Sequence, residues 1–457
     1  MSGLGAMAGS TVVALATPLG RSAVAVVRLS GADALCVARL VCPAGPRWLA
    51  RRATVRLALD PATGARVDQV LAVWMPGPHS YTGEDVVELS CHGNPRVADA
   101  LVRACLSGGA AAARPGEFTR RAVESGRLSM LQAEAVGALI EASSLEGARI
   151  ALSGLGGAVD REITALRERL LDLAAELEAR LDHPTDDLGH LDDAQVAAQL
   201  QEVARHALRL AAGWEHNRPL IHGARVALLG PVNAGKSSLF NRLLGMERAL
   251  VSELAGTTRD VVEARLDLGG MEVTLLDTAG RHAAAGPIEQ AGIAIADRML
   301  ADVDLVLLVG ALDEGADAAQ AFAATIAALA APCGDRPFLV VGTHGDRLRA
   351  PPSSPALVVS SQTGDGIEAL RLAMRSALSV RLVGDDLIGA TSQRQHAGLL
   401  AVAHAADEAA AALLGLDGPA VAAHALVDGL VSLGELLGQD VREEVLDRLF
   451  ERFCIGK

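Results

Sequence analysis

The eight residues GPVNAGKS at positions 230–237 decide the fold of this chain, because they read G-x-x-x-x-G-K-S. An apolar segment, 225–229, runs directly into them, and 238–244 continues with helical spacing. A strand, a glycine-containing loop and a helix in this order predict a phosphate-binding loop. Its backbone N–H groups would point at phosphate oxygens. Lys236 would place its charge on the outer phosphates, and Ser237 would offer its hydroxyl to Mg²⁺.

Lysine is almost absent from the chain. Of its 41 basic residues, only Lys236 and Lys457 are lysine, and all the others are arginine. A compact ammonium group and a planar guanidinium group are not interchangeable. A composition that uses arginine elsewhere therefore indicates that these two positions need an ammonium group. Lys236 lies in the phosphate loop, where we expect a catalytic role, and Lys457 ends the terminal sequence FCIGK.

Two further motifs belong to the same site. Residues 256–260 read GTTRD, and residues 277–280 read DTAG at the end of a second apolar strand. Thr258 is the natural second hydroxyl on Mg²⁺, and Asp277 can reach the metal through water. Segments of this kind order around a γ-phosphate and relax when it leaves. The order of the motifs favours a GTPase over a generic ATPase. The residues predicted to bind GTP are Asn233, Ala234, Gly235, Lys236, Ser237, Ser238, Ser252, Thr257, Thr258, Asp277, Thr278, Ala279, Gly280, Asp346 and Ser360.

The base-recognition loop departs from the usual N-K-x-D pattern. After an apolar strand the chain reads GTHGD at residues 342–346. Asp346 can still accept hydrogen bonds from guanine, but Thr343 and His344 replace the usual Asn and Lys. The sequence SSQ at residues 360–362 could supply a backbone N–H to the guanine oxygen. GTP is the predicted nucleotide, with weakened affinity or selectivity as the expected consequence.

Apolar periodicity divides the chain into regions. Short β-like runs, such as 24–27 and 70–74, are separated by Gly and Pro turns up to about residue 120 and predict an α+β domain. Apolar residues then recur every three or four positions from Asp160 to Asp182, and again over 196–214, which predicts two long helices. The triplet Asn217-Arg218-Pro219 is expected to break the second helix.

Strands and helical stretches alternate from residue 225 to about 380, which is typical of a parallel sheet with right-handed crossovers. The expected strands are 225–229, 273–276, 305–309, 338–341 and 356–359. Helical spacing returns from Leu426 to the C-terminus. We therefore predict a multidomain α/β and α+β protein in which a Ras-like P-loop G domain is inserted into a helical domain. The predicted domains are an N-terminal domain at 1–120, a helical domain at 121–220 and 381–457, and the G domain at 221–380.

Composition restricts the partners and the compartment. The net charge of −14 argues against a general nucleic-acid coat, but residues 1–120 hold 12 Arg and 8 Asp or Glu, so an anionic ligand would prefer this segment. The six cysteines show no C-x-x-C and no zinc-like pairing with histidine, which favours reduced thiols in a cytoplasm. No basic leader and no run of about 18 apolar residues is present. We expect a cytoplasmic protein without a membrane partner.

With these motifs in hand, nearly the whole chain resembles one family, the bacterial and organellar tRNA-modification GTPases called MnmE or TrmE. Outside the G domain the likeness includes VRLSG at 27–31, SYTGEDVVEL at 80–89, RPGEFT at 114–119, QAEA at 132–135 and FCIGK at 453–457. A terminal CIGK beside an internal phosphate loop is a highly specific combination.

The resemblance implies a K⁺-dependent GTPase that is a homodimer and works with a flavin-dependent partner, MnmG (GidA), in a heterotetramer or larger assembly. Together such proteins add an aminomethyl-type group, carboxymethylaminomethyl, to C5 of the wobble uridine U34 of tRNA. The carbon would come from 5-formyl- or 5,10-methylene-tetrahydrofolate bound to the N-terminal domain, which also serves dimerisation. The residues that the family implies for folate are Arg28, Glu88, Arg127 and Lys457. Arg127 stands where lysine is commoner in the family.

The resemblance also implies the hydrolytic residues. Ras-type enzymes orient the attacking water with a Gln after DTAG, but this chain has Arg281 there, which cannot accept a proton. In the family a Glu farther along orients the water, and a K⁺ ion replaces an arginine finger. The Glu corresponds to Glu289, which from sequence alone could equally be a carboxylate at a helix start. The residues implied for K⁺ are Asn233, Ser252, Leu254 and Thr257.

Cys454 leaves two interpretations open. A cysteine between apolar neighbours is usually a small core residue, whereas the resemblance suggests that it takes part in the chemistry on uridine. Two alternatives to the whole assignment also stay open. One is a ribosome-assembly GTPase of the same superfamily, which would carry a basic RNA-binding appendage that is not visible here. The other is a folate-binding scaffold that has lost GTP through its altered base loop.

Overall fold

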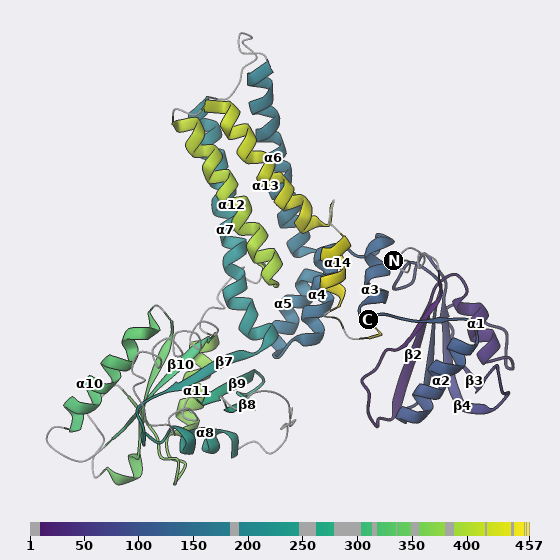
Figure 1. Cartoon of the computed structure of the whole chain (residues 1–457), viewed down its shortest axis with the longest axis horizontal. Helices are drawn as coiled ribbons and strands as arrows, with labels where there is room; N and C mark the ends of the chain where they lie inside the picture. Colours follow the sequence, from purple (N-terminus) through teal and green to yellow (C-terminus); the bar gives the residue numbers. More distant parts are fainter. Residues whose placement is uncertain are drawn as a thin grey trace, which may run out of the picture. The chain divides into compact units, whose positions relative to one another are not determined.

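The structure is a computed structural model that describes residues 10–182, 192–245, 262–277, 303–312, 318–334, 336–348, 356–379, 388–415, 418–439, 443–451, 453 and 455–456. The chain forms two compact units. The first comprises Met1–Gly137, Asp160–Glu168 and Leu430–Lys457, and the second comprises Ala138–Val159 and Arg169–Gly429. Each unit is described by itself, with its elements labelled as in Figure 1.

A six-stranded sheet organises the first unit, in the order β3-β4-β5-β2-β1-β6. Its strands are β1 (Val12–Leu15), β2 (Val24–Ser30), β3 (Thr54–Leu59), β4 (Arg66–Met75), β5 (Val86–His92) and β6 (Ala111–Ala112). Helices α1 (Ala34–Val41) and α2 (Pro95–Ser107) cover one face of this sheet (Figure 1). Ala25, Val27 and Leu29 of β2 are buried in the core, whereas Val26 and Arg28 alternate with them and are only partly buried. This alternation is that of a sheet with one covered face.

Two short helices and the chain end complete the first unit. Helix α3 (Glu117–Glu124) contacts α14 (Glu443–Phe450), and α4 (Met130–Glu141) follows α3 along the chain. Gly116 precedes α3 with φ +66°, and a Cβ there would lie 2.7 Å from the carbonyl oxygen of Phe450. Beyond α14, Ile455 forms an isolated antiparallel bridge with Pro115. Glycine at position 116 therefore lets the C-terminal segment reach the start of α3.

Long helices form one part of the second unit: α5 (Leu145–Leu155), α6 (Ala158–Asp182), α7 (Asp193–His222), α12 (Gln393–Leu414) and α13 (Gly418–Leu437). Helices α4, α6 and α13 each contribute residues to both units. A capping box of Asp192 and Gln195 starts α7. Helices α7 and α12 contact each other along their length, and their buried positions include many alanines, which allow a close approach.

Helix α7 is longer than expected, because Pro219 does not break it. The helix continues through the proline to His222. A proline removes one backbone N–H, but the helix can continue where its remaining polar groups find partners. Here the Ser143 and Ser144 hydroxyls donate to the Leu220 carbonyl at 3.0 and 2.9 Å. Burial of Leu220 and its neighbours adds to these bonds.

Helices α12 and α13 are long and apolar enough to cross a membrane by length and composition alone, among the described residues. Within the protein, 50% of the apolar window in α12 and 28% of that in α13 is buried. The sequence contains no unbroken apolar run of that length, so the similarity lies in mean hydropathy, which the many alanines raise.

The other part of the second unit is built on a sheet in the order β12-β11-β10-β7-β9-β8. Its strands are β7 (Ala224–Leu229), β8 (Val262–Asp267), β9 (Glu272–Asp277), β10 (Leu305–Ala311), β11 (Phe338–Thr343) and β12 (Leu357–Val358). Its helices are α8 (Lys236–Gly245), α10 (Ala318–Ala330) and α11 (Ile367–Ser379). The five strands expected from the sequence are all present, and the fold class is confirmed.

The sheet has one edge strand, β8, that the sequence pattern did not predict. Strand β8 pairs antiparallel with β9, while the other pairs of this sheet are parallel. Gly269 and Gly270, with φ +66° and +93°, make the tight turn between the two strands. The edge strand alternates charged and apolar residues and lacks the continuous apolar run of a central strand such as β10, so its pattern is weak.

We predict that Gly213→Ala destabilises the second unit. Gly213 of α7 faces the segment before α12, and a Cβ there would lie 2.7 Å from the Gly389 Cα, a backbone atom. Overpacking of this kind costs about 1–3 kcal/mol. Thermal unfolding should show a lower midpoint for Gly213→Ala. Gly20→Ala is the matched control, because nothing lies within 4 Å of its added Cβ. Equal midpoints for the two variants would contradict the close contact.

Candidate functional site

The phosphate loop lies between the end of β7 and the start of α8, as its sequence predicts. A Cβ at Gly230 would lie 2.2 Å from the carbonyl oxygen of Val309 on β10, so only glycine fits. Asn233 and Gly235 have φ +62° and +80°, which curls the loop around its own backbone. A loop of this shape, followed directly by a helix N-terminus, directs N–H groups toward a bound anion.

Lys236 and Ser237 begin α8, and their side chains contact the phosphate loop and Asp277. The Lys236 ammonium donates to the carbonyl oxygens of Gly230 and Pro231 at 2.8 and 2.7 Å. Burial lowers the pKa of Lys236, and the Asp277 carboxylate partly opposes this shift. The Ser237 hydroxyl donates to Asp277 Oδ2 at 3.0 Å, which brings the loop to the end of β9. A hydroxyl and a carboxylate side by side are oxygen ligands that suit Mg²⁺.

The base loop is joined to the phosphate loop by a residue whose role the sequence did not reveal. Thr343 is buried, and its hydroxyl lies 2.7 Å from the carbonyl oxygen of Ala234 and 3.2 Å from that of Gly310. The position at which Asn was expected thus still ties the two loops together. His344, with φ +62°, turns the chain toward Asp346. No sequence signal pointed to this bond, because it joins residues more than a hundred positions apart.

Asp346 lies at the surface beside Ser360. The Ser360 hydroxyl donates to Asp346 Oδ1 at 2.6 Å, and this hydrogen bond is the main cause of the lowered pKa of Asp346. The carboxylate is therefore kept ionised as a hydrogen-bond acceptor. The sequence predicted a backbone N–H from residues 360–362 for the guanine oxygen, and the structure adds that the Ser360 side chain orients Asp346.

The structure brings the described members of the nucleotide site together on the loops at one edge of the sheet. The described members are Asn233, Ala234, Gly235, Lys236, Ser237, Ser238, Asp277, Asp346 and Ser360. The predicted residues outside the described ranges are Ser252, Leu254, Thr257, Thr258, Thr278, Ala279, Gly280 and Glu289.

A second site lies on the less covered face of the sheet in the first unit. Arg28 on β2 and Glu88 on β5 are direct cross-strand partners. Arg28 donates to Glu88 Oε1 from Nε at 2.9 Å and from Nη2 at 2.8 Å. The Arg28 guanidinium also lies over two aromatic rings, 5.6 Å from the centroid of Tyr81 and 5.7 Å from that of Phe118. A charged pair is therefore placed beside aromatic rings.

The end of the chain reaches this second site. Arg28 Nη1 donates to the carbonyl oxygen of Gly456 at 3.3 Å. A Cβ at Gly456 would lie 2.2 Å from the carbonyl oxygen of Leu15, so the chain end is packed closely on β1. Arg127 Nε donates to the carbonyl oxygen of Ser80, next to Tyr81. Lys457 and Cys454 lie outside the described residues. Arg28, Glu88 and the neighbours of Arg127 thus belong to one region.

The phosphate loop, its serine beside Asp277, and a carboxylate-bearing base loop on a mixed six-stranded sheet define a P-loop GTPase domain. Comparison of the sequence with protein families matches "GTP-binding protein TrmE N-terminus" at residues 11–127 and "MnmE helical domain" at residues 130–454. The chain belongs to the MnmE (TrmE) family of tRNA modification GTPases, and the resemblance inferred from the motifs is confirmed.

Individual relatives agree over the full length. The chain is 41% identical over 465 residues to the tRNA modification GTPase MnmE of Prochlorococcus marinus (strain MIT 9303), covering 98% of each chain. It is 38% identical over 471 residues to that of Nitratidesulfovibrio vulgaris (strain DP4), covering 98% of this chain and 99% of the relative. Among solved structures, the G domain of the T. maritima FeoB iron transporter matches 34% of this chain and 98% of its own, at 25% identity and a TM-score of 0.26.

We predict that Thr343→Val loosens the nucleotide site. Valine keeps the shape but leaves the Ala234 and Gly310 carbonyls without the hydroxyl. The free energy of unfolding should fall by about 1 kcal/mol, and the affinities for GTP and GDP should fall together, because both nucleotides use the phosphate loop. Urea unfolding and calorimetric titration measure the two effects. Thr343→Ser, which keeps a hydroxyl, is the control; equal nucleotide affinities for the Val and Ser variants would exclude this role.

Proposed function

We propose that this chain is a K⁺-dependent GTPase that, with the flavin-dependent partner MnmG, modifies C5 of the wobble uridine U34 of tRNA. The product would be a carboxymethylaminomethyl-type group whose carbon comes from 5-formyl- or 5,10-methylene-tetrahydrofolate. The observation that carries this proposal is the presence in one chain of two separate polar sites. One is the phosphate loop, and the other is the Arg28–Glu88 pair beside Tyr81 and Gly456.

The residues of the G domain divide the work of GTP binding. The phosphate loop and Lys236 hold the phosphates, Ser237 and Asp277 would hold Mg²⁺ with Thr258, and Asp346 accepts hydrogen bonds from the base. Bound Mg²⁺ and K⁺ would neutralise charge on the phosphates. Asn233, on the curled loop, would contribute to the K⁺ site with Ser252, Leu254 and Thr257. Thr278, Ala279 and Gly280 would follow the γ-phosphate, and Glu289 would orient the attacking water.

The second site suits a reduced pterin. The ring of a tetrahydrofolate presents N–H donors along one edge, which the Glu88 carboxylate can accept. Tyr81 and Phe118 offer aromatic surface beside it. Arg28 and Arg127 would balance the negative charge of the glutamate tail, together with Lys457. Folate supplies a one-carbon unit when bound, and the protein residues orient that unit. Cys454 would lie close to this chemistry, in a segment that adjoins Gly456.

The exposed apolar surface and the positive charge of the N-terminal domain indicate which partners it could bind. Val55 and Leu71 are cross-strand neighbours and are about half exposed, 57% and 44%, so they form an apolar surface on the sheet. Such a surface suits a homodimer through the N-terminal domain. The net positive charge of residues 1–120 suits an anionic ligand. We place the working enzyme in the cytoplasm, with tRNA and MnmG in a heterotetramer or larger assembly.

GTP hydrolysis in K⁺ and in Na⁺ buffer tests the G-domain part of the proposal. We expect strong stimulation by K⁺ and a preference for GTP over ATP. A ribosome-assembly GTPase would lack the link between turnover and tRNA modification, so U34 modification by the wild-type protein with MnmG is measured in parallel. Absence of hydrolysis with either nucleotide would favour the folate-binding scaffold instead.

Glu289→Ala should bind GTP normally and lose most of its turnover, since the water-orienting carboxylate is gone. Single-turnover hydrolysis in K⁺ buffer and equilibrium nucleotide binding separate the two effects. Glu272→Ala is the control, because Glu272 is a partly exposed residue of β9 that pairs with Arg265 outside the nucleotide site. An unchanged rate for Glu289→Ala would rule this residue out as the positioning group.

Glu88→Gln should weaken tetrahydrofolate binding while GTP hydrolysis is kept. Gln has the same shape but no charge, and hydrogen bonds to a charged group contribute about 1.5–3 kcal/mol, so we expect a loss of at least about tenfold. Calorimetric titration with 5-formyl-tetrahydrofolate measures the affinity. Asp99→Asn, which alters an exposed ion pair with Arg103 in the same unit, is the matched control. Undiminished folate affinity in Glu88→Gln would contradict the assignment of this carboxylate.

A further inference from the structure

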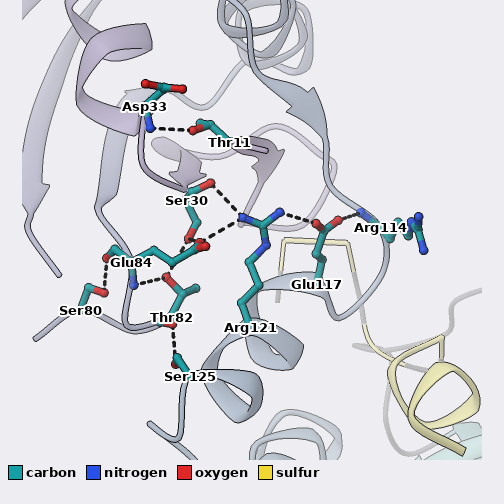
Figure 2. A network of polar contacts seen from close by, with 10 residues as sticks. All are labelled: Thr11, Ser30, Asp33, Ser80, Thr82, Glu84, Arg114, Glu117, Arg121 and Ser125. Atoms are coloured by element: carbon teal, nitrogen blue, oxygen red, sulfur yellow. Dashed lines mark hydrogen bonds and ion pairs between the residues drawn. The ribbon is translucent and has the colours of Figure 1, made fainter. Parts of the chain in front are cut away.

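A buried arginine contacts the loop that carries Tyr81 and is not among the residues that the family motifs assign. Arg121 of α3 has a side chain that is only 9% exposed and lies between two carboxylates. Its Nη1 donates to Glu84 Oε2 at 3.0 Å, and its Nη2 donates to Glu117 Oε1 at 2.7 Å (Figure 2). The planar fork of a guanidinium can hold two carboxylates at once, which an ammonium cannot do with fixed geometry.

The first carboxylate belongs to the loop that carries Tyr81. Glu84 Oε2 also accepts from the Ser30 hydroxyl at 2.8 Å, and that hydroxyl lies 2.7 Å from the hydroxyl of Thr82. Figure 2 shows the Glu84 carboxylate and the Ser30 carbonyl oxygen beside the Arg121 guanidinium, with the carbonyl 3.4 Å from Nη1. The same loop presents the Tyr81 ring to Arg28 and the Ser80 carbonyl to Arg127. Arg121 thus holds the Tyr81 loop through its ion pair with Glu84.

The second carboxylate belongs to the segment on which the chain end docks. Glu117 Oε2 accepts from the backbone N–H of Arg114 at 2.7 Å, next to Pro115. Pro115 forms the bridge with Ile455, and the following Gly456 accepts from Arg28. The contacts therefore run from Arg121 through Glu117 to the C-terminal residues. Through the two carboxylates Arg121 is thus linked to two segments that each carry residues next to the second site.

We propose that Arg121 is a positioning residue that joins the Tyr81 loop to the docking segment of the C-terminal tail, and so sets the width of the tetrahydrofolate site. This inference rests on the proposed folate function. Arg121 acts through Glu84 and Glu117 and does not itself touch the ligand. Glu84 lies on the Tyr81 loop, whereas Glu117 lies one helical turn before Arg121 on α3, so a single two-pronged donor on α3 holds both carboxylates.

Arg121→Met tests the inference through two readouts in the full-length protein. Affinity for 5-formyl-tetrahydrofolate, measured by calorimetry, should fall by at least about tenfold. Release of the C-terminal residues by carboxypeptidase, followed by mass spectrometry, should become faster. Basal GTP hydrolysis should not change. Arg121→Lys, which keeps the charge but not the fork, should give an intermediate affinity.

Arg56→Met is the matched control for loss of a buried arginine. Arg56 lies in the same unit, is buried, and bonds to the carbonyls of Ala44 and Pro46 at a place that has no contact with Arg28 or Glu88. Its loss should lower the unfolding midpoint without changing folate affinity or release of the tail. If Arg121→Met fails to fold, the double variant Glu84→Gln with Glu117→Gln removes the same two ion pairs and should show the same two effects.

The outcomes separate the two proposals. Wild-type protein that does not bind 5-formyl-tetrahydrofolate would overturn the folate function, and release of the tail alone would then decide whether Arg121 holds it. Wild-type protein that binds folate, with an Arg121→Met variant that binds equally well and keeps its tail, would overturn the positioning role. Equal losses in Arg121→Met and Arg56→Met would also overturn it, because they would show only a general loss of stability.

Discussion

A single residue, Gly223, separates the long helix α7 from the central strand β7, and the inserted G domain depends on this junction. With φ +84° the glycine turns the chain at once, so no flexible linker intervenes at this end. Asp304 at the start of β10 closes the junction, because it accepts from the backbone N–H of Arg225 at 2.8 Å and from the guanidinium of Arg218. Burial raises the pKa of Asp304, and these partners oppose the shift.

Backbone hydrogen bonds from the segment before α5 also stabilise the junction between α7 and β7. Ser143 donates its backbone N–H to Ile221 and accepts at its carbonyl from the N–H of Glu272, the first residue of β9. Helix α7, the segment before α5 and the sheet are thus bonded through backbone groups, which side-chain substitutions do not remove. A strand that carries Asp277 at its far end is therefore attached to the helices at its near end. If Asp277 moved, β9 would be displaced at that end only, because backbone hydrogen bonds hold its other end to the helices.

The sequence predicted the parts of this protein whose residues are close together along the chain. The phosphate loop, the strands of the sheet and helix α6 are all local patterns, and each has its expected place. Helix α12 was not predicted, because a run of alanines gives little contrast between its buried and exposed faces. Strand β8 was missed because an edge strand is short of apolar residues. The end of α7 was misplaced because serines from a distant segment bond its last carbonyls.

At the two candidate sites, too, only features that are local in the sequence could be predicted. Arg28 and Glu88 could be named from motifs, but their cross-strand pairing depends on a register that joins positions 60 residues apart. The bond from Thr343 to the phosphate loop and the contacts of Arg121 could not be found, since each joins segments that only the fold brings near. What a motif specifies is the group that meets the ligand. Several residue types can hold that group in place, so the supporting residues have no fixed sequence motif.

The positions where lysine is present or absent show the same difference between a group that meets the ligand and a group that supports the site. Lys236 is largely buried with its ammonium between two carbonyls of its own loop, 2.8 and 2.7 Å away, a space that suits a compact cation. Arg127 donates from Nε to the Ser80 carbonyl, using a donor that lysine lacks. His344 turns the base loop while Thr343 makes its bond to the phosphate loop. The ammonium of Lys236 is thus enclosed by its own loop, whereas Arg127 is exposed and His344 is only partly buried.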